Sequence, residues 1–182
     1  MEDNKSAIVF YEVTKETEEK RTWLIVENLM TAKTMKEPKI LFKLIRMPKN
    51  GEAKAVEQFY VDIDDARVFA QKILMNPSNG FSHEITKWKK QGDAVELKTL
   101  SIKIRNKYNQ VYTLLRGEKI AGEADNATDP NGQLTAQAYK PKEGELPSFS
   151  EAIQLSLDET IGLAKALQDE ILASRVFRLI YQ

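Results

Sequence analysis

Apolar and polar residues alternate along most of this chain with the period of two that is typical of β-strands. The N-terminal half contains four such segments, rich in β-branched and aromatic residues. They span residues 7–14, 22–30, 39–47 and 56–63. A segment with helical periodicity follows, from Asp64 to about Leu74, and the run Asn76-Pro77-Ser78-Asn79-Gly80 ends it. The first half therefore predicts four strands and one helix.

The C-terminal half repeats this order with longer segments. Strands are expected over residues 82–89, 95–105 and 110–119, with part of a strand over 134–139. Residues 153–157 lead into a helix that starts near Asp158 and runs past Leu172. The stretches 122–132 and 141–150 are polar and predict loops.

The junction between the last strand and the helix occurs twice. Tyr60–Leu74 aligns without a gap with Gln154–Gln168, so that Asp64 meets Asp158 at an offset of 158 − 64 = 94 residues. An Asp at the start of a helix can accept hydrogen bonds from the exposed N–H groups of the first turn. We therefore interpret Asp64 and Asp158 as N-caps, and the neighbouring carboxylates of Asp65 and Glu159 as partners of the helix dipole rather than as acid–base or metal groups.

These patterns predict an α+β fold of two tandem units, each a four-stranded antiparallel sheet plus a helix, in the order ββββα-ββββα with pseudo-two-fold symmetry. The first unit spans residues 1–78, the second spans 79–172, and an apolar C-terminal tail spans 173–182. A sheet with one helix leaves a face uncovered, so we expect the two units to form one compact domain. Either the helices pack together or one sheet continues beside the other.

The sequence contains few of the residues and motifs that are typical of catalytic or metal-binding sites. Cysteine is absent and His83 is the single histidine, which argues against disulfides and against thiolate or histidine metal sites. No phosphate-binding glycine loop and no nucleophile elbow is found. We therefore expect no catalytic residues, metal or cofactor, and a protein that is not an enzyme. The N-terminus does not resemble a signal peptide and no apolar run is long enough to span a membrane, so we expect a cytoplasmic protein without membrane contact.

Charge is balanced in total but segregated along the chain. There are 27 basic and 27 acidic residues. Residues 31–54 hold seven basic and two acidic residues, net +5, and residues 82–120 hold nine and four, net +5. Residues 121–170 hold three and ten, net −7. Segregated charge keeps a nucleic-acid partner open, although the neutral total argues weakly against one.

One stretch of the second half resembles a known family. The run L-S-I-K-I-R-N-K-Y-N-Q-V-Y-T-L-L-R-G-E-K, residues 100–119, and the later I-Q-L-S-L-D-E-T-I-G-L-A-K-A-L, residues 153–167, resemble the single-stranded-DNA-binding domain of the transcriptional positive cofactor family. A chain with two such units resembles the Whirly proteins. The resemblance implies a Whirly-like fold, oligomerisation and binding of single-stranded DNA.

The candidate binding residues are cations on predicted strands and aromatic residues beside them, because single strands are held by cations along the phosphates and by rings that stack on bases. Lys103 and Arg105 alternate with Ile102 and Ile104, so they share a face. Lys43 and Arg46 are three residues apart, so they cannot share a face of one regular strand. The candidates are Lys43, Lys87, Trp88, Lys89, Lys98, Lys103, Arg105, Tyr108, Tyr112 and Arg116. The competing interpretation is that the cations only solvate the outer face of a half-buried sheet and that the aromatic residues belong to the core.

We therefore predict a protein that binds single-stranded nucleic acid, with DNA preferred over RNA, on a basic and aromatic sheet surface without reading sequence. It would act as a dimer or tetramer in transcription, replication or recombination. The alternative is a structural or regulatory protein–protein interaction module on the same fold, with contacts through sheet edges or the C-terminal tail.

Overall fold

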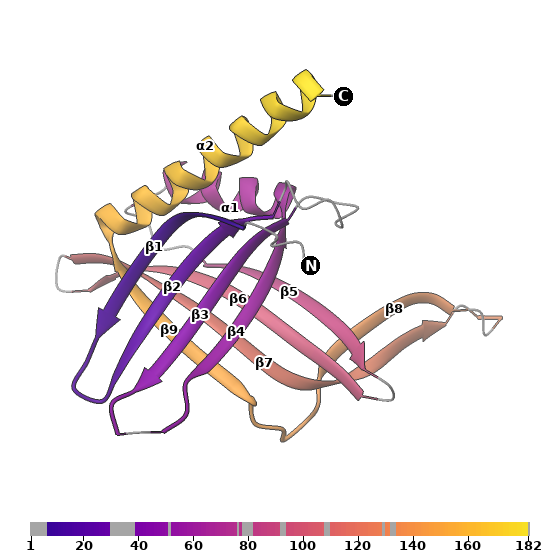
Figure 1. The fold of residues 1–182 in the computed structure, drawn as a ribbon. Helices are drawn as coiled ribbons and strands as arrows, with labels where there is room; N and C mark the ends of the chain where they lie inside the picture. The colour runs from indigo at the N-terminus through magenta and orange to yellow at the C-terminus, as the bar shows by residue number, and fades with distance from the viewer. Residues whose placement is uncertain are drawn as a thin grey trace, which may run out of the picture.

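The structure is a computed structural model that describes residues 7–29, 39–50, 52–75, 77, 82–91, 94–107, 110–128, 130–131 and 134–181. These residues form nine strands and two helices (Figure 1). The first half holds β1 (Ile8–Glu16), β2 (Lys20–Asn28), β3 (Lys39–Pro48), β4 (Ala55–Asp62) and α1 (Ile63–Met75). The second half holds β5 (Ser82–Gln91), β6 (Ala94–Lys107), β7 (Gln110–Thr128), β8 (Leu134–Pro141), β9 (Phe149–Ser156) and α2 (Leu157–Tyr181).

The strands form two antiparallel sheets. Sheet A has the order β1-β2-β3-β4, and sheet B has the order β5-β6-β7-β8 with β9 also paired to β7. The long strand β7 serves two partners in succession: Tyr112–Lys119 pair with β9, and Gly122–Thr128 pair with β8. Strand β6 begins at Ala94, and its Val95 pairs with Gly122 of β7. The residues of β7 after Gly122 therefore extend beyond β6, and they form a projecting arm with β8 (Figure 1).

The predicted ββββα-ββββα layout is confirmed. The 94-residue offset carries the bounds of β4 exactly onto those of β9, since 55 + 94 = 149 and 62 + 94 = 156. In the second unit β9 therefore takes the place that β4 has in the first, at the edge of the sheet and directly before the helix. The strand β8 has no counterpart in the first unit.

One hydrophobic core is shared by both halves. The two sheets face each other with their strands crossing, and α1 and α2 pack together over one end (Figure 1). Equivalent positions of the two units are buried in this core: Phe59 and Ile153, Val61 and Leu155, Phe69 and Leu163, Ala70 and Ala164, Ile73 and Leu167. The helices therefore pack together, which was one of the two arrangements left open by the sequence.

The N-cap of α2 lies two residues earlier than predicted. At α2 the Ser156 hydroxyl accepts from the Glu159 N–H at 3.2 Å, and the Glu159 carboxylate accepts from the Ser156 N–H at 2.7 Å. This reciprocal pair is a capping box. Asp158 lies inside the first turn, as does Asp64 in α1. The interpretation of Asp64 and Asp158 as N-caps was wrong, because the strands pass into the helices at Asp62 and Ser156 without an intervening loop.

The C-terminal residues continue α2 rather than forming a separate tail. The helix runs to Tyr181 and its last turns extend beyond the sheets (Figure 1). Leu172 and Val176 are 63% and 48% exposed on this extension. The side chains of residues 177–182, which include most of the apolar tail, lie outside the described part of the chain.

The two sheets approach each other most tightly at Gly117 of β7. A Cβ atom added there would lie 2.5 Å from the Phe59 ring and 2.6 Å from a Leu44 methyl group of sheet A. Phe59 and Leu44 are 3% and 0% exposed, so neither side chain has space to move away. Gly117 is therefore needed for the contact between the sheets.

We expect Gly117→Ala to lower the free energy of unfolding by about 1–3 kcal/mol, the usual cost of overpacking a core. Urea denaturation followed by circular dichroism measures this loss. Gly162→Ala is the matched control, because a Cβ at Gly162 in α2 meets only Tyr11 at 3.8 Å. Alanine is favoured over glycine within a helix by about 0.5–1 kcal/mol, so the control should raise stability. Equal effects of the two changes would contradict this account.

Candidate functional site

Four of the predicted site residues lie together on the outer face of sheet B. In the register of β6 and β7, Arg105 lies opposite Tyr112, Lys103 opposite Leu114, and Ser101 opposite Arg116. Directly opposite residues point to the same side of a sheet, and positions two apart on one strand do so too. Lys103, Arg105, Tyr112 and Arg116 therefore share one face, which is the side away from sheet A. We refer to these four residues as the basic surface.

The cations of the basic surface differ in their pairing. Arg116 forms an ion pair with Glu118 at 2.7 Å and donates to the Ser150 hydroxyl at 2.9 Å. Lys103 and Arg105 are exposed, and neither takes part in an ion pair among the described residues. These two side chains can therefore meet an anionic partner without giving up an existing one.

Two aromatic residues accompany these cations. Tyr112 is half-buried and borders a shallow groove of about 520 Å³ that Lys15, Gln154 and Ser156 also line. Trp88 of β5 lies opposite Leu97 on the same face and is 48% exposed. It is separated from Lys103 by roughly 20 Å along the strands, given about 3.3 Å per residue. Trp88 therefore lies on the same face of sheet B as the basic surface but at a distance from it along the strands.

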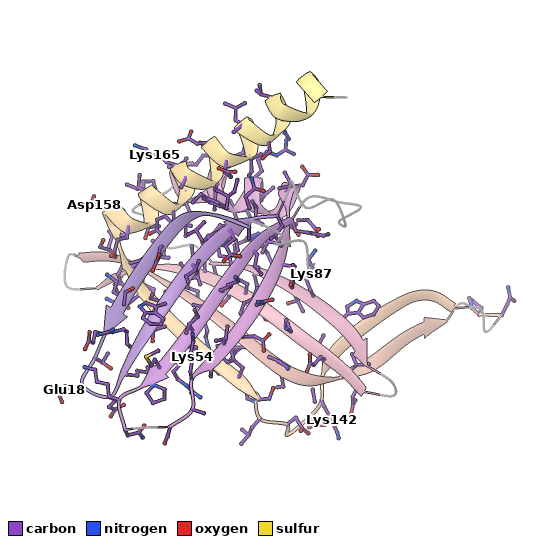
Figure 2. The ribbon with its side chains drawn as sticks, in the orientation of Figure 1. Glu18, Lys54, Lys87, Lys142, Asp158 and Lys165 are labelled. Carbon is purple, nitrogen blue, oxygen red and sulfur yellow. The ribbon has the colours of Figure 1, made fainter. Side chains whose placement is uncertain are left out.

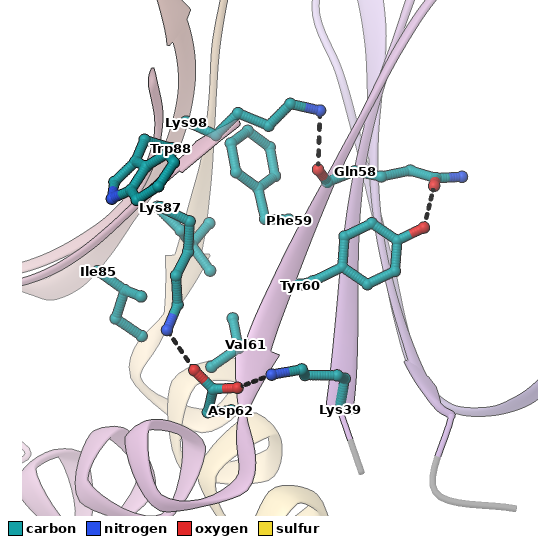
Figure 3. Close-up of a pocket in the computed structure, with 11 residues that line it drawn as sticks. Lys39, Gln58, Phe59, Tyr60, Val61, Asp62, Ile85, Lys87, Trp88 and Lys98 are labelled. Carbon is teal, nitrogen blue, oxygen red and sulfur yellow. Dashed lines mark hydrogen bonds and ion pairs between the residues drawn. The ribbon is translucent and has the colours of Figure 1, made fainter. Parts of the chain in front are cut away.

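Lys87 and Lys98 do not belong to the basic surface. Lys98 is an odd number of residues from Lys103 and Arg105, so its side chain shares the inner face with Leu100 and Ile102. Both lysines bridge to β4 of sheet A (Figure 3). Lys87 pairs with Asp62 and, at 3.2 Å, with Asp65. Lys98 pairs with Glu57 and donates to the Gln58 carbonyl at 3.4 Å. These cations serve as links between the sheets.

Lys43 lies on the outer face of sheet A and is neutralised there. Its amine pairs with Glu27 at 2.5 Å, and the two side chains are 23% and 8% exposed. Because Lys43 lies opposite Ile25 and Arg46 opposite Thr22, the two cations point to opposite faces, as the alternation predicted. Lys43 therefore stands apart from the basic surface on sheet B.

Two predicted residues have no described side chain. Lys89 lies in β5 opposite Glu96, but its side chain is outside the described part of the structure. Tyr108 lies between β6 and β7, outside the described residues altogether. The ten predicted residues thus include four on the basic surface and Trp88 further along the same face.

A pocket that the sequence did not predict lies where the edges of the two sheets meet. It has a volume of about 380 Å³, and Figure 3 shows β4 on one side of it and β5 and β6 on the other. Its apolar lining consists of Phe59, Val61, Ile85 and Leu100. Tyr60, Gln58 and Trp88 also line it, as do the charged groups of Lys39, Asp62, Lys87 and Lys98. Tyr60 and Gln58 were missed because the pocket exists only once the sheets are packed.

The charges at this pocket stabilise one another. Asp62 accepts from Lys39 with one oxygen and from Lys87 with the other (Figure 3). Burial by itself would raise the pKa of Asp62, but the hydrogen bonds from Lys39 and Lys87 outweigh it and lower the pKa. Burial likewise opposes charge on Lys87, yet its bonds to Asp62 and Asp65 raise the pKa of the amine. The bridge is therefore charged at neutral pH.

His83 and Tyr11 are two further groups whose pKa values are shifted, mainly by burial. Burial and the nearby Lys72 lower the pKa of His83, whose Nδ1 lies 3.2 Å from the Lys72 amine. Burial raises the pKa of Tyr11 to about 12, and its hydroxyl donates to the Glu159 carbonyl at 2.8 Å. Within the described ranges, no three His, Cys, Asp or Glu residues are placed to hold a metal ion. In the same residues, no helix combines the length and apolar character needed to cross a membrane.

No protein-family model matches the chain, and no curated protein matches it either. Functional inference therefore depends on the residues and the geometry described above.

We expect Asp62→Asn to lower the free energy of unfolding at neutral pH. We also expect the free energy of unfolding of the variant to change less as the pH falls into the acidic range. Because the folded-state pKa of Asp62 lies below its ordinary value of 3.8, the carboxylate contributes stability above about pH 4, and this contribution is lost as the pH falls through the lower folded-state value. Urea denaturation between neutral and acidic pH measures both effects. Parallel pH profiles for the variant and the unmodified protein would contradict the assignment.

Proposed function

We propose that the protein binds single-stranded nucleic acid, with DNA preferred over RNA, on the outer face of sheet B. The observation that carries this proposal is the placement of Lys103 and Arg105 on one exposed face, outside the described ion pairs, next to Tyr112 and Arg116. Lysine and arginine gain affinity for a polynucleotide by releasing its condensed counterions. Unpaired surface cations are therefore worth more for this purpose than the neutralised Lys43, Lys87 and Lys98.

The aromatic residues on the same face supply the second component of such binding. Trp88 is exposed and Tyr112 is half-buried beside a shallow groove. Stacking of a base on an aromatic side chain contributes about 1–3 kcal/mol and accepts any base. Cations combined with stacking rings favour binding that is largely independent of sequence. The resemblance of residues 100–119 and 153–167 to the Whirly and transcriptional positive cofactor families also supports this proposal.

This proposal includes a homo-oligomer in the cytoplasm. Leu172 and Val176 are exposed on the part of α2 that extends beyond the sheets, and a second copy would cover them. The same observation favours the alternative function, a protein–protein interaction module. Nucleic-acid binding requires the positive charges of the basic surface, whereas an interaction through α2 does not. Charge reversal on the basic surface therefore distinguishes the two functions.

We expect the double change Lys103→Glu, Arg105→Glu to weaken binding to oligo-dT and to leave the oligomer intact. Fluorescence anisotropy with a labelled strand of about thirty nucleotides, long enough for more than one site of about 4–16 nucleotides, measures the affinity at several salt concentrations. Losing two phosphate contacts should reduce the slope of log K against log salt by about 1.4, since each contact to a single strand contributes about 0.7. An excess of unlabelled duplex should not compete with the labelled strand.

The matched control is Lys165→Glu, Arg175→Glu, which changes the net charge equally but places the new charges on exposed positions of α2. Lys165 lies on the helix, away from sheet B (Figure 2). If the control weakens binding as much as the reversal on sheet B, net charge rather than the basic surface is responsible. If the sheet B variant binds oligo-dT normally but loses its oligomeric state in light scattering, the interaction module is the better explanation.

A further inference from the structure

Sheet A carries apolar side chains on both of its faces. Its inner face packs into the shared core through residues such as Leu24 and Phe59. Strand alternation places the residues between them on the outer face, and several of these are apolar or aromatic as well: Val9, Trp23, Ile25, Ile45, Val56 and Tyr60. A strand with one face in water alternates between apolar and polar residues, whereas a strand that is buried on both faces is apolar nearly throughout. Sheet A therefore has the residue pattern of a sheet that is covered on both sides.

The second repeat provides a comparison within the same chain. Val56 of β4 lies opposite Ile45 of β3. The counterpart of Val56 in β9, Ser150, lies opposite Glu118 of β7. The same correspondence relates three further pairs on the outer faces: Trp23 to Thr99, Ile25 to Ser101, and Tyr60 to Gln154. The outer face of sheet B is thus polar at positions where that of sheet A is apolar, so the apolar character of sheet A is not a requirement of the fold.

The two outer faces also differ in charge. The counterpart of Lys103 in sheet A is Glu27, and the counterpart of Arg116 is Lys43. Glu27 and Lys43 form an ion pair with each other at 2.5 Å. Because this pair is neutral within one copy, it does not attract a polyanion, and two copies of the face can meet without repulsion between unpaired charges of this pair. The face therefore suits a surface like itself better than it suits a nucleic acid.

The dimensions of sheet A match those of a protein interface. Its four strands lie about 4.8 Å apart and strands such as β1 and β2 have nine residues, so the face measures roughly 19 Å by 30 Å. Two such faces in contact would cover roughly 1,100 Å² in total, which exceeds the approximately 1,000 Å² expected of a specific interface. The two described helices pack over one end of the sheets (Figure 1), so neither of them lies across this face.

We propose that the outer face of sheet A is the contact surface of a two-fold dimer, in which it packs on the same face of a second copy. A two-fold contact uses one patch on both copies, so an apolar patch with internally paired charges is complementary to itself. This contact is separate from the exposed part of α2, and it does not depend on the proposed binding of nucleic acid. It leaves the basic surface of each copy uncovered, because sheet B lies on the other side of sheet A.

The test introduces one carboxylate into the proposed contact. Tyr60→Glu and Val56→Glu should each halve the mass of the particle in sedimentation velocity and raise its dissociation constant at least about 100-fold, because two-fold symmetry brings the new charge into the interface twice. The side chains of Tyr60 and Val56 are 43% and 45% exposed in a single copy, so the fold should tolerate both changes. Thermal unfolding followed by circular dichroism checks that it does.

Gln154→Glu is the matched control, because Gln154 is the counterpart of Tyr60 and is exposed on the outer face of sheet B. This variant should keep the mass of the unmodified protein. Leu172→Glu, Val176→Glu tests α2 in the same way. A halved mass in this variant as well as in Tyr60→Glu indicates a tetramer with two kinds of contact and supports the proposal.

Several outcomes would overturn the dimer. They are an unmodified protein that sediments as a monomer, an unchanged mass in Tyr60→Glu and Val56→Glu, or an equal loss of mass in Gln154→Glu. If Tyr60→Glu keeps its mass but weakens binding to oligo-dT as much as Lys103→Glu, Arg105→Glu does, sheet A is a nucleic-acid surface instead. If the unmodified protein does not bind oligo-dT but Tyr60→Glu still halves its mass, the proposed function fails and the dimer stands.

Discussion

The shared core between the two sheets is the constraint on which the rest of the molecule depends. Each sheet must bury one face, and each helix must bury one stripe. The duplicated junction places Phe59 and Val61 of one unit against the same interior as Ile153 and Leu155 of the other. Once these faces are committed to the interior, strand alternation assigns every other residue of the strands to the outside. Gly117 marks where the two sheets come so close that no side chain fits.

Whether a strand residue points to the interior or to the outer face decides whether its positive charge needs a partner. A charge on the inner side or in the narrow space between sheet edges loses hydration and has to be paired. Lys87 and Lys98 meet this demand with Asp62 and Glu57 of the opposite sheet. A charge on an open sheet face keeps its hydration, so Lys103 and Arg105 persist without a partner in the described structure. Lys87 and Lys98 therefore hold the edges of the sheets together, whereas Lys103 and Arg105 are available to a polyanion.

The same edge arrangement produces the pocket. Strand β4 is the last strand of sheet A and β5 is the first of sheet B. Lysine–carboxylate bridges link β4 to sheet B beside a pocket of about 380 Å³. The bridging lysines lie beside the apolar residues Phe59, Val61, Ile85 and Leu100 that line this pocket.

The sequence by itself determined the local elements and their repetition. Alternation predicted the strands, the 94-residue repeat predicted the second strand–helix junction, and the spacing of Lys103 and Arg105 placed both on one face, because these properties depend only on backbone periodicity. Alternation also separates Lys98 from Lys103, because the two are five residues apart on one strand. Only the tertiary structure decided that β9 rather than β8 completes the second unit, and that Lys87 and Lys98 meet carboxylates of sheet A. These contacts join residues far apart in the sequence, and their geometry follows from how two twisted sheets pack, which no local pattern encodes.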